Sequence, residues 1–219
     1  MNWIGREEII TSDRDWIAPQ ARNQTFQVTL YGGGGSGSCD GNYANFVAGA
    51  GGGSGEMVFK ELNIPQDTRV SITIGRGGEG LIDSDQVSDY INHIVGKSGG
   101  TTYFGNMFCA NGGLGGNINV GGQGGYDGGN TGMDAEGNYI GYGVNDTVDG
   151  YNYSSGGGAP SMNARGVGGC ANRSSGNAGT AGGGCGAFIE RVDADGTLHR
   201  RIGSGGDGVC IIRYYAPLK

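Results

Sequence analysis

The sequence predicts an ordered, all-β protein that is built largely from glycine. Glycine supplies 52 of the 219 residues, more than three times its usual share of about 7 %. Each glycine in a regular helix or strand costs about 0.5–1 kcal/mol relative to alanine, which excludes a helical bundle and disfavours an ordinary α/β enzyme. Polar and apolar residues alternate in several segments near the two ends of the chain, which is typical of half-buried strands.

The composition also argues against the other classes of glycine-rich chain. Only 4 prolines are present and no Gly-X-Y period spans the chain, which excludes collagen. Disordered chains usually lack aromatic residues and carry more charge, whereas this chain has 11 tyrosines and only 16 % charged residues. We therefore expect a single ordered domain over residues 1–219, with a strand framework at about 7–109 and 186–217 and a glycine-rich insert at about 110–186.

Seven segments are predicted as strands on their alternation or their apolar character. The predicted strands are residues 25–31, 56–64, 69–74, 101–108, 187–192, 197–202 and 208–215. From Phe26 to Leu30, for example, every second residue is apolar. The dipeptide Asp195-Gly196 predicts a tight turn that joins two of these strands into a hairpin. Over residues 84–95 the pattern fits either a helix or an irregular strand–loop segment.

The central part of the chain, between about Gly99 and Gly186, follows a different period. In the run GGLGGNINVGGQGGY, residues 112–126, two of the three faces at a step of three are almost entirely glycine. The third face carries Leu114, Asn117, Val120, Gln123 and Tyr126. Three residues per turn is the period of a polyproline-II-type helix. In a glycine version every N–H can donate to a neighbouring helix and so satisfy the backbone; a flexible glycine loop is the alternative.

The charge and the cysteines restrict the partners. The net charge is −7 and the sequence pI is about 4.7, so neither nucleic acid nor an anionic membrane is expected as a partner. No run of 18 apolar residues is present, so no membrane insertion is expected. The first eight residues lack the pattern of a signal peptide, so export by the usual pathway is not expected. The five cysteines form no C-x-x-C pair; we expect reduced thiols, no metal and no cofactor.

Two glycine motifs have enzyme-like spacing but lack the context that the chemistry needs. Residues 75–80 spell G-x-G-x-x-G, the dinucleotide pattern, but no acidic residue follows about 20 positions later. Residues 96–100 spell G-x-S-x-G, the nucleophile elbow of hydrolases. The chain offers only His93 and His199 as bases and has no α/β frame. We therefore expect no enzymatic activity.

Three fragments together resemble the glycine-rich domain of bacteriophage tail-fibre and tail-appendage proteins. They are IITSDRDWIAPQARNQTFQVTLYGGGGSG near the start, VSITIGRGGEG before the centre and GGDGVCIIRYYAP at the end. The resemblance covers about residues 7–217. It implies a sandwich-like framework of terminal strands, with a sheaf of polyglycine-II-type helices and with loops exposed at one end.

The resemblance also implies a function. A protein of this type would be a virion component, made in the host cytoplasm, whose apical loops touch a receptor on the bacterial surface, either a protein or a polysaccharide. Its other partners would be phage tail or virion proteins, and a homotrimer is a further expectation because related fibre parts are commonly trimers. The alternative is a decoration or connector protein that contacts only other phage proteins.

The receptor-binding residues are predicted in the loops of residues 126–153. No lysine or arginine occurs between Ser98 and Ala164, whereas acidic residues and tyrosines accumulate there. Tyrosine with asparagine, serine and glycine is the composition of binding loops, and it suits a neutral or basic partner such as a surface sugar. The predicted residues are Tyr126, Tyr139, Tyr142, Tyr151, Tyr153, Asp134, Asp146 and Asp149. Alternatively, the tyrosines pack on the flanks of the glycine helices.

Overall fold

The protein is an all-β molecule whose main framework is two four-stranded sheets. The computed structural model describes residues 2–38, 40–43, 46–48, 50–80, 94–117, 120–124, 152–154, 183, 188–192 and 198–218. One sheet has the strand order β1-β13-β3-β6 and the other has the order β2-β7-β8-β9, with every pair antiparallel. The predicted all-β, sandwich-like fold is confirmed.

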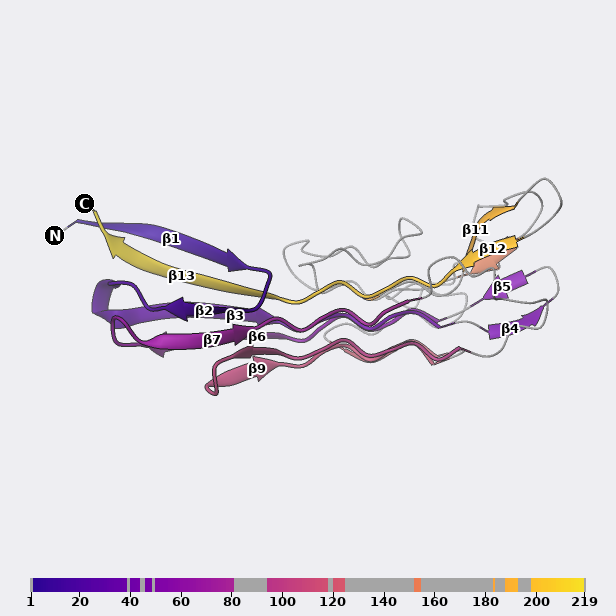
Figure 1. Ribbon diagram of the computed structural model, residues 1–219, viewed down its shortest axis with the longest axis horizontal. Helices are drawn as coiled ribbons and strands as arrows, with labels where there is room; N and C mark the ends of the chain where they lie inside the picture. Colours follow the sequence, from indigo (N-terminus) through magenta and orange to yellow (C-terminus); the bar gives the residue numbers. More distant parts are fainter. Residues whose placement is uncertain are drawn as a thin grey trace.

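The first sheet combines the two ends of the chain with two early strands. Its members are β1 (Trp3–Ile10), β3 (Thr25–Tyr31), β6 (Met57–Asn63) and β13 (Val209–Pro217). The second sheet contains β2 (Arg14–Ile17), β7 (Arg69–Thr73), β8 (Thr102–Phe104) and β9 (Phe108–Ala110). A short 3-10 helix, η1 (Arg22–Gln24), leads into β3. Because β13 pairs with β1 on one side and with β3 on the other, the two termini lie together at one end of the molecule (Figure 1).

A hydrophobic core fills the space between the two sheets. Trp16 packs edge-to-face on Phe26, with ring centroids 5.2 Å apart, and lies 5.9 Å from Phe104. The core is completed by Ile10, Val28, Leu30, Ile64, Val70, Ile72, Ile74, Cys210 and Ile212 among others. Fully burying a side chain of this size stabilises the fold by about 1.5–3 kcal/mol. The alternation that predicted the strands therefore marks the residues that face this core.

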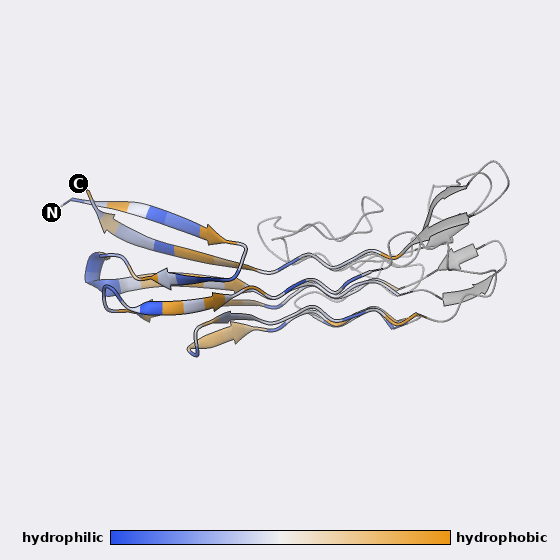
Figure 2. Ribbon diagram, in the orientation of Figure 1, coloured by the Kyte–Doolittle hydropathy of each residue, from blue (hydrophilic) through white to orange (hydrophobic). Residues whose placement is uncertain are grey.

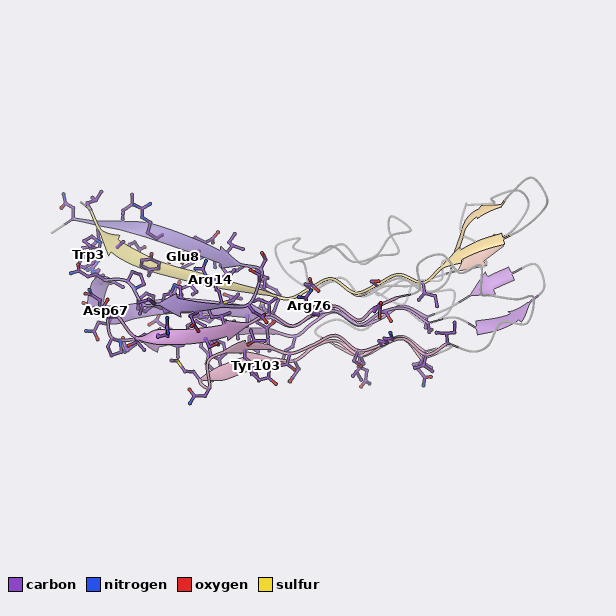
Figure 3. The ribbon with its side chains drawn as sticks, in the orientation of Figure 1. Trp3, Glu8, Arg14, Asp67, Arg76 and Tyr103 are labelled. Carbon is purple, nitrogen blue, oxygen red and sulfur yellow. The ribbon has the colours of Figure 1, made fainter. Side chains whose placement is uncertain are left out.

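The sandwich edge also contains a polar link between the two sheets. The Tyr214 hydroxyl on β13 donates to Glu8 Oε1 on β1 at 3.0 Å. Glu8 Oε2 in turn accepts from the Arg14 guanidinium of β2 at 3.2 Å (Figure 3). Partial burial and the bond to Glu8 raise the pKa of Tyr214. The link ties the first strand of one sheet to the first strand of the other.

Most predicted strands coincide with observed ones, and one was wrong. Residues 101–108 were predicted as one strand, but β8 ends at Phe104 and β9 begins at Phe108. Gly105 has a φ of 53°, and the N–H of Met107 donates to the carbonyl of Phe104 at 3.1 Å. A positive φ cannot continue a strand, so the segment folds into a hairpin. The 84–95 prediction lies largely outside the described residues, and so does the predicted 195–196 turn.

Five further strands lie away from the sandwich. β4 (Asp40–Tyr43) pairs with β5 (Phe46–Ala48), which pairs in parallel with β10 (Asn152–Ser154). β11 (Phe188–Val192) and β12 (Leu198–Arg201) form an antiparallel pair, as predicted for the hairpin strands. Figure 1 places β4, β5, β11 and β12 at the end opposite the termini. Long, nearly straight segments connect this end to the sandwich, and Figure 2 shows that the hydrophobic strands are concentrated in the sandwich rather than in these segments.

Candidate functional site

The connection between the two ends is a bundle of seven extended segments, which we call the glycine sheaf. Its segments are residues 32–38, 50–56, 74–80, 94–101, 111–117, 120–124 and 202–208. Segments 32–38, 74–80 and 111–117 continue β3, β7 and β9 away from the sandwich. Segments 50–56, 94–101 and 202–208 lead back into β6, β8 and β13.

Segment 32–38 lies inside the sheaf and donates to three neighbours in strict rotation. The N–H groups of Gly32, Gly35 and Ser38 bond segment 50–56, those of Gly33 and Ser36 bond segment 94–101, and those of Gly34 and Gly37 bond segment 202–208. The acceptors step back by three residues each time, and the distances are 2.8–3.0 Å. Two more segments donate to its carbonyls, 111–117 and 74–80. This threefold rotation of lateral bonds is the arrangement of polyglycine-II helices.

The burial of segment 111–117 has the same period. Asn111, Leu114 and Asn117 are exposed, whereas Gly113 and Gly116 are buried. Val120 and Gln123, which belong to the same predicted face, are exposed as well. The step of three in the sequence is therefore confirmed in the described part of this run, and the alternative of a flexible loop is excluded there. Tyr126, the last residue of that face, lies outside the described residues.

Close approach of neighbouring backbones explains why the sheaf consists of glycine. A Cβ atom added at Gly35 would collide with the backbone of Leu114 and would lie 2.7 Å from the Gly115 nitrogen. One added at Gly205 would collide with Gly34. Real Cβ atoms almost never come within 3.0 Å of another heavy atom, and backbone cannot move aside as a flexible side chain can. The glycines are required by lateral packing and not by an unusual φ.

Polar side chains complete the sheaf where a carbonyl does not meet an N–H group. Asp207 Oδ1 accepts from the N–H of Gly77 at 2.7 Å, and Ser204 Oγ accepts from the N–H of Gly80 at 2.8 Å. The donor advances by three residues while the acceptor steps back by three, so the two pairs lie one turn apart. Charged residues on the edge of a β-sheet prevent another strand from pairing there. In the same way, these two side chains accept from N–H groups that a further extended segment could otherwise bind. The sequence analysis did not predict a role for Ser204 and Asp207, although they stand three residues apart in a glycine run.

The junction with the sandwich depends on Thr102. Its side chain is fully buried, and its hydroxyl donates to the carbonyl of Tyr31 at 2.7 Å. The same oxygen accepts from the N–H of Gly75 at 2.9 Å. Thr102, the first residue of β8, thus links the ends of β3 and β7 at the point where all three strands meet the sheaf.

The two enzyme-like glycine motifs are sheaf segments. In residues 75–80, the N–H groups of Gly77, Gly78 and Gly80 are all bonded within the sheaf. In residues 96–100, the Lys97 amine pairs with Glu79 at 2.8 Å, which lowers the pKa of Glu79. Close backbone packing explains the glycines of both motifs, because an added Cβ would collide with neighbouring backbone at Gly77 and at Gly96. The described residues hold no cluster of metal-binding side chains, and none of their helices is long and apolar enough to cross a membrane.

The predicted receptor-binding residues fall mostly outside the described part of the chain. This applies to Tyr126, Tyr139, Tyr142, Tyr151, Asp134, Asp146 and Asp149. Tyr153 belongs to β10, where it is the register partner of Val47 on β5. Since β5 lies at the end of the sheaf opposite the termini (Figure 1), the backbone of Tyr153 lies at that end too.

One comparison with known proteins identifies a relationship. A family model described as a glycine-rich domain matches residues 11–215, nearly the whole chain. The match includes both sheets except for β1 and the last two residues of β13, and it includes every segment of the glycine sheaf. No curated protein matches the chain.

Proposed function

The chain belongs to this glycine-rich domain family, and three of its fragments resemble phage tail-fibre domains; on this basis we propose that it is a non-enzymatic virion protein of a bacteriophage. In this proposal it is a tail-fibre or appendage component that attaches to a receptor on the bacterial surface. The observation that carries the proposal is the glycine sheaf, which holds β4, β5, β11 and β12 far from the termini. A rigid spacer between two ends suits a protein that is anchored at one end and binds at the other.

The receptor-binding residues in this proposal are the tyrosines and aspartates of residues 126–153. Support comes from their composition, which lacks basic residues, and from β10, which places the backbone of Tyr153 at the far end. Truncating an aromatic anchor in a binding loop typically weakens the free energy of binding by about 1–4 kcal/mol. The receptor would be a polysaccharide or a protein loop that carries lysine.

Binding of the purified protein to host cells tests the proposal. The double variant Tyr151→Ala/Tyr153→Ala should bind cells at least tenfold more weakly than the parent and keep its fold. Tyr103→Ala is the matched control, because Tyr103 is an exposed tyrosine on the sandwich, and it should bind normally. If the double variant folds and binds as well as the parent, the receptor site lies elsewhere.

The alternative function is a decoration or connector protein that contacts only other phage proteins. It predicts no binding to host cells and tight association with capsid or tail components. A homotrimer is a further part of the proposal, since neighbouring polyglycine helices gain lateral bonds. The mass in solution tests it, and a clean species of 22.3 kDa would exclude the trimer.

A further inference from the structure

The first sheet divides into a fork at the end that carries the termini. β13 pairs with β3 only as far as Arg213 and Gln27. Its pairing with β1 continues for four more residues, to Trp3 and Pro217. Beyond Arg213 the β1–β13 arm therefore leaves the rest of the sheet (Figure 1). The space between the two arms is a cleft of about 590 Å³.

The 3-10 helix η1 causes the fork. The N–H of Thr25, the first residue of β3, donates to the carbonyl of Arg22 and so is not available to β13. Asn23 and Gln24 both have a φ of 56°, which is costly for residues other than glycine. Strained residues of this kind concentrate at functional sites. The wall of the cleft is thus held in a conformation that prevents the sheet from closing.

The fork leaves part of the β13 backbone open. Leu218 donates to the carbonyl of Asn2, so the even-numbered residues of β13 bond β1 and the odd-numbered ones face β3. The first odd-numbered residue past Arg213 is Tyr215. Among the described residues, neither its N–H nor its carbonyl has a partner. An open strand edge of this kind is where an extended peptide can add to a sheet.

The side chains around the cleft carry an unpaired positive charge. Arg213 is bound by Glu7, and Glu61 accepts a hydrogen bond from Gln27 at 3.4 Å. Arg6 and Arg22 also line the cleft, and in the described part of the chain neither forms an ion pair. Tyr215, which also lines the cleft, has a side chain that is 59 % exposed. Three arginines and two glutamates line the cleft, so its lining has a net charge of +1 in a protein whose net charge is −7. A positive lining beside an open strand edge favours an acidic ligand.

We propose that this cleft binds an extended, acidic segment of a partner protein, which adds to β13 as a strand. The backbone of the segment would bond Tyr215, and its carboxylates would lie against Arg6 and Arg22. The inference goes beyond the proposed function, which concerns receptor contact at the opposite end of the sheaf. It assigns a docking role to the end that holds the termini.

A synthetic peptide tests this inference directly. The probe is a labelled octapeptide of alternating glutamate and valine, and its binding is measured by fluorescence anisotropy at low salt. We expect binding that weakens at least tenfold in the variant Arg6→Glu/Arg22→Glu. The control variant Arg69→Glu/Arg76→Glu makes the same change of charge at exposed arginines outside the cleft and should bind within twofold of the parent.

Two further measurements separate strand addition from simple attraction of charge. A probe with N-methylated valines keeps its carboxylates but cannot form the ladder, so it should bind at least tenfold more weakly. Hydrogen exchange at the Tyr215 amide should slow when the unmodified probe is bound. Equal binding of both probes, or no binding at millimolar peptide, would overturn the proposal. Binding of polygalacturonate through Arg6 and Arg22 in place of the peptide would also overturn it, because the cleft would then be a saccharide site.

Discussion

Ser36 and Lys97 exchange two hydrogen bonds across the interior of the glycine sheaf. The N–H of Ser36 donates to the carbonyl of Lys97 at 2.8 Å, and the N–H of Lys97 donates to the Ser36 hydroxyl oxygen at 2.8 Å. Polyglycine-II neighbours exchange one such bond per turn, and the serine hydroxyl supplies the second acceptor. Ser38 and Ala50 repeat the arrangement. A few side chains thus complete bonds that the backbone alone would leave unmade.

Replacing Ser36 by alanine should destabilise the protein by about 1–3 kcal/mol, because the part-buried N–H of Lys97 would lose its acceptor. The free energy of unfolding, measured with denaturant, checks this. Ser98→Ala is the control, since Ser98 lies in the same segment but is exposed. Equal stability of the two variants would mean that the hydroxyl of Ser36 is not needed.

Gly35→Ala should be far more damaging, with a loss of more than about 3 kcal/mol, because the new methyl group would meet rigid backbone on Leu114 and Gly115. Gly5→Ala provides the comparison. A Cβ atom there would touch only the Tyr215 ring, at 3.8 Å, so its effect should stay within about 1 kcal/mol. Thermal melting of both variants gives the answer, and a stable Gly35→Ala protein would contradict the tight packing of the sheaf.

The thiol of Cys210 should be inert in the folded protein. Burial in the core raises its pKa to about 12, so almost no thiolate exists at pH 8. Alkylation by iodoacetamide, followed by mass spectrometry, should be at least 100-fold slower in the native state than in denaturant. Cys109, which is only partly buried, should react faster. Since an unfolded thiol has a pKa of about 8.5, this group stabilises the fold fully below that pH and loses its contribution as the pH rises toward 12.

Tyr214→Phe should lower the free energy of unfolding by about 1 kcal/mol at neutral pH, because the hydrogen bond to Glu8 is lost. Because burial and this bond raise the pKa of Tyr214, the folded state favours the protonated hydroxyl. The tyrosine therefore contributes fully below the unfolded pKa of about 10, and its contribution falls as the pH rises through the folded value. Unfolding curves at pH 8 and pH 11 should show a smaller difference between parent and variant at the higher pH. A difference that is independent of pH would contradict this.

The parts of the fold that the sequence predicts are those with a local period. Alternation identified β3 and β7 because one face of each packs on the core. The step of three identified the glycine run of residues 112–126, because its neighbours rotate with that step, but not the five other segments of the sheaf. β1 was missed because it is an edge strand with mostly exposed residues on both faces. The short strands β2, β4, β5 and β10 offer too few residues to establish a period.

Long-range features had no such signal. The fork exists because Thr25 donates to Arg22 rather than to β13, a choice that no local pattern records. The capping of Gly77 by Asp207 joins residues 130 positions apart in the chain. Of the predicted receptor site, only the backbone position of Tyr153 lies in the described part of the chain, so that site remains a prediction.

The threefold rotation of bonds around segment 32–38 also restricts how the length of this protein can change during evolution. Inserting one or two residues into a sheaf segment would turn every later side chain by a third or two-thirds of a circle, and non-glycine residues would then face neighbouring backbone. Inserting three residues restores the orientation and lengthens the segment by about 9 Å. A longer sheaf therefore requires three extra residues in each neighbouring segment, inserted at the same distance from the sandwich. The distance between the two ends of the molecule can thus grow only in coordinated steps.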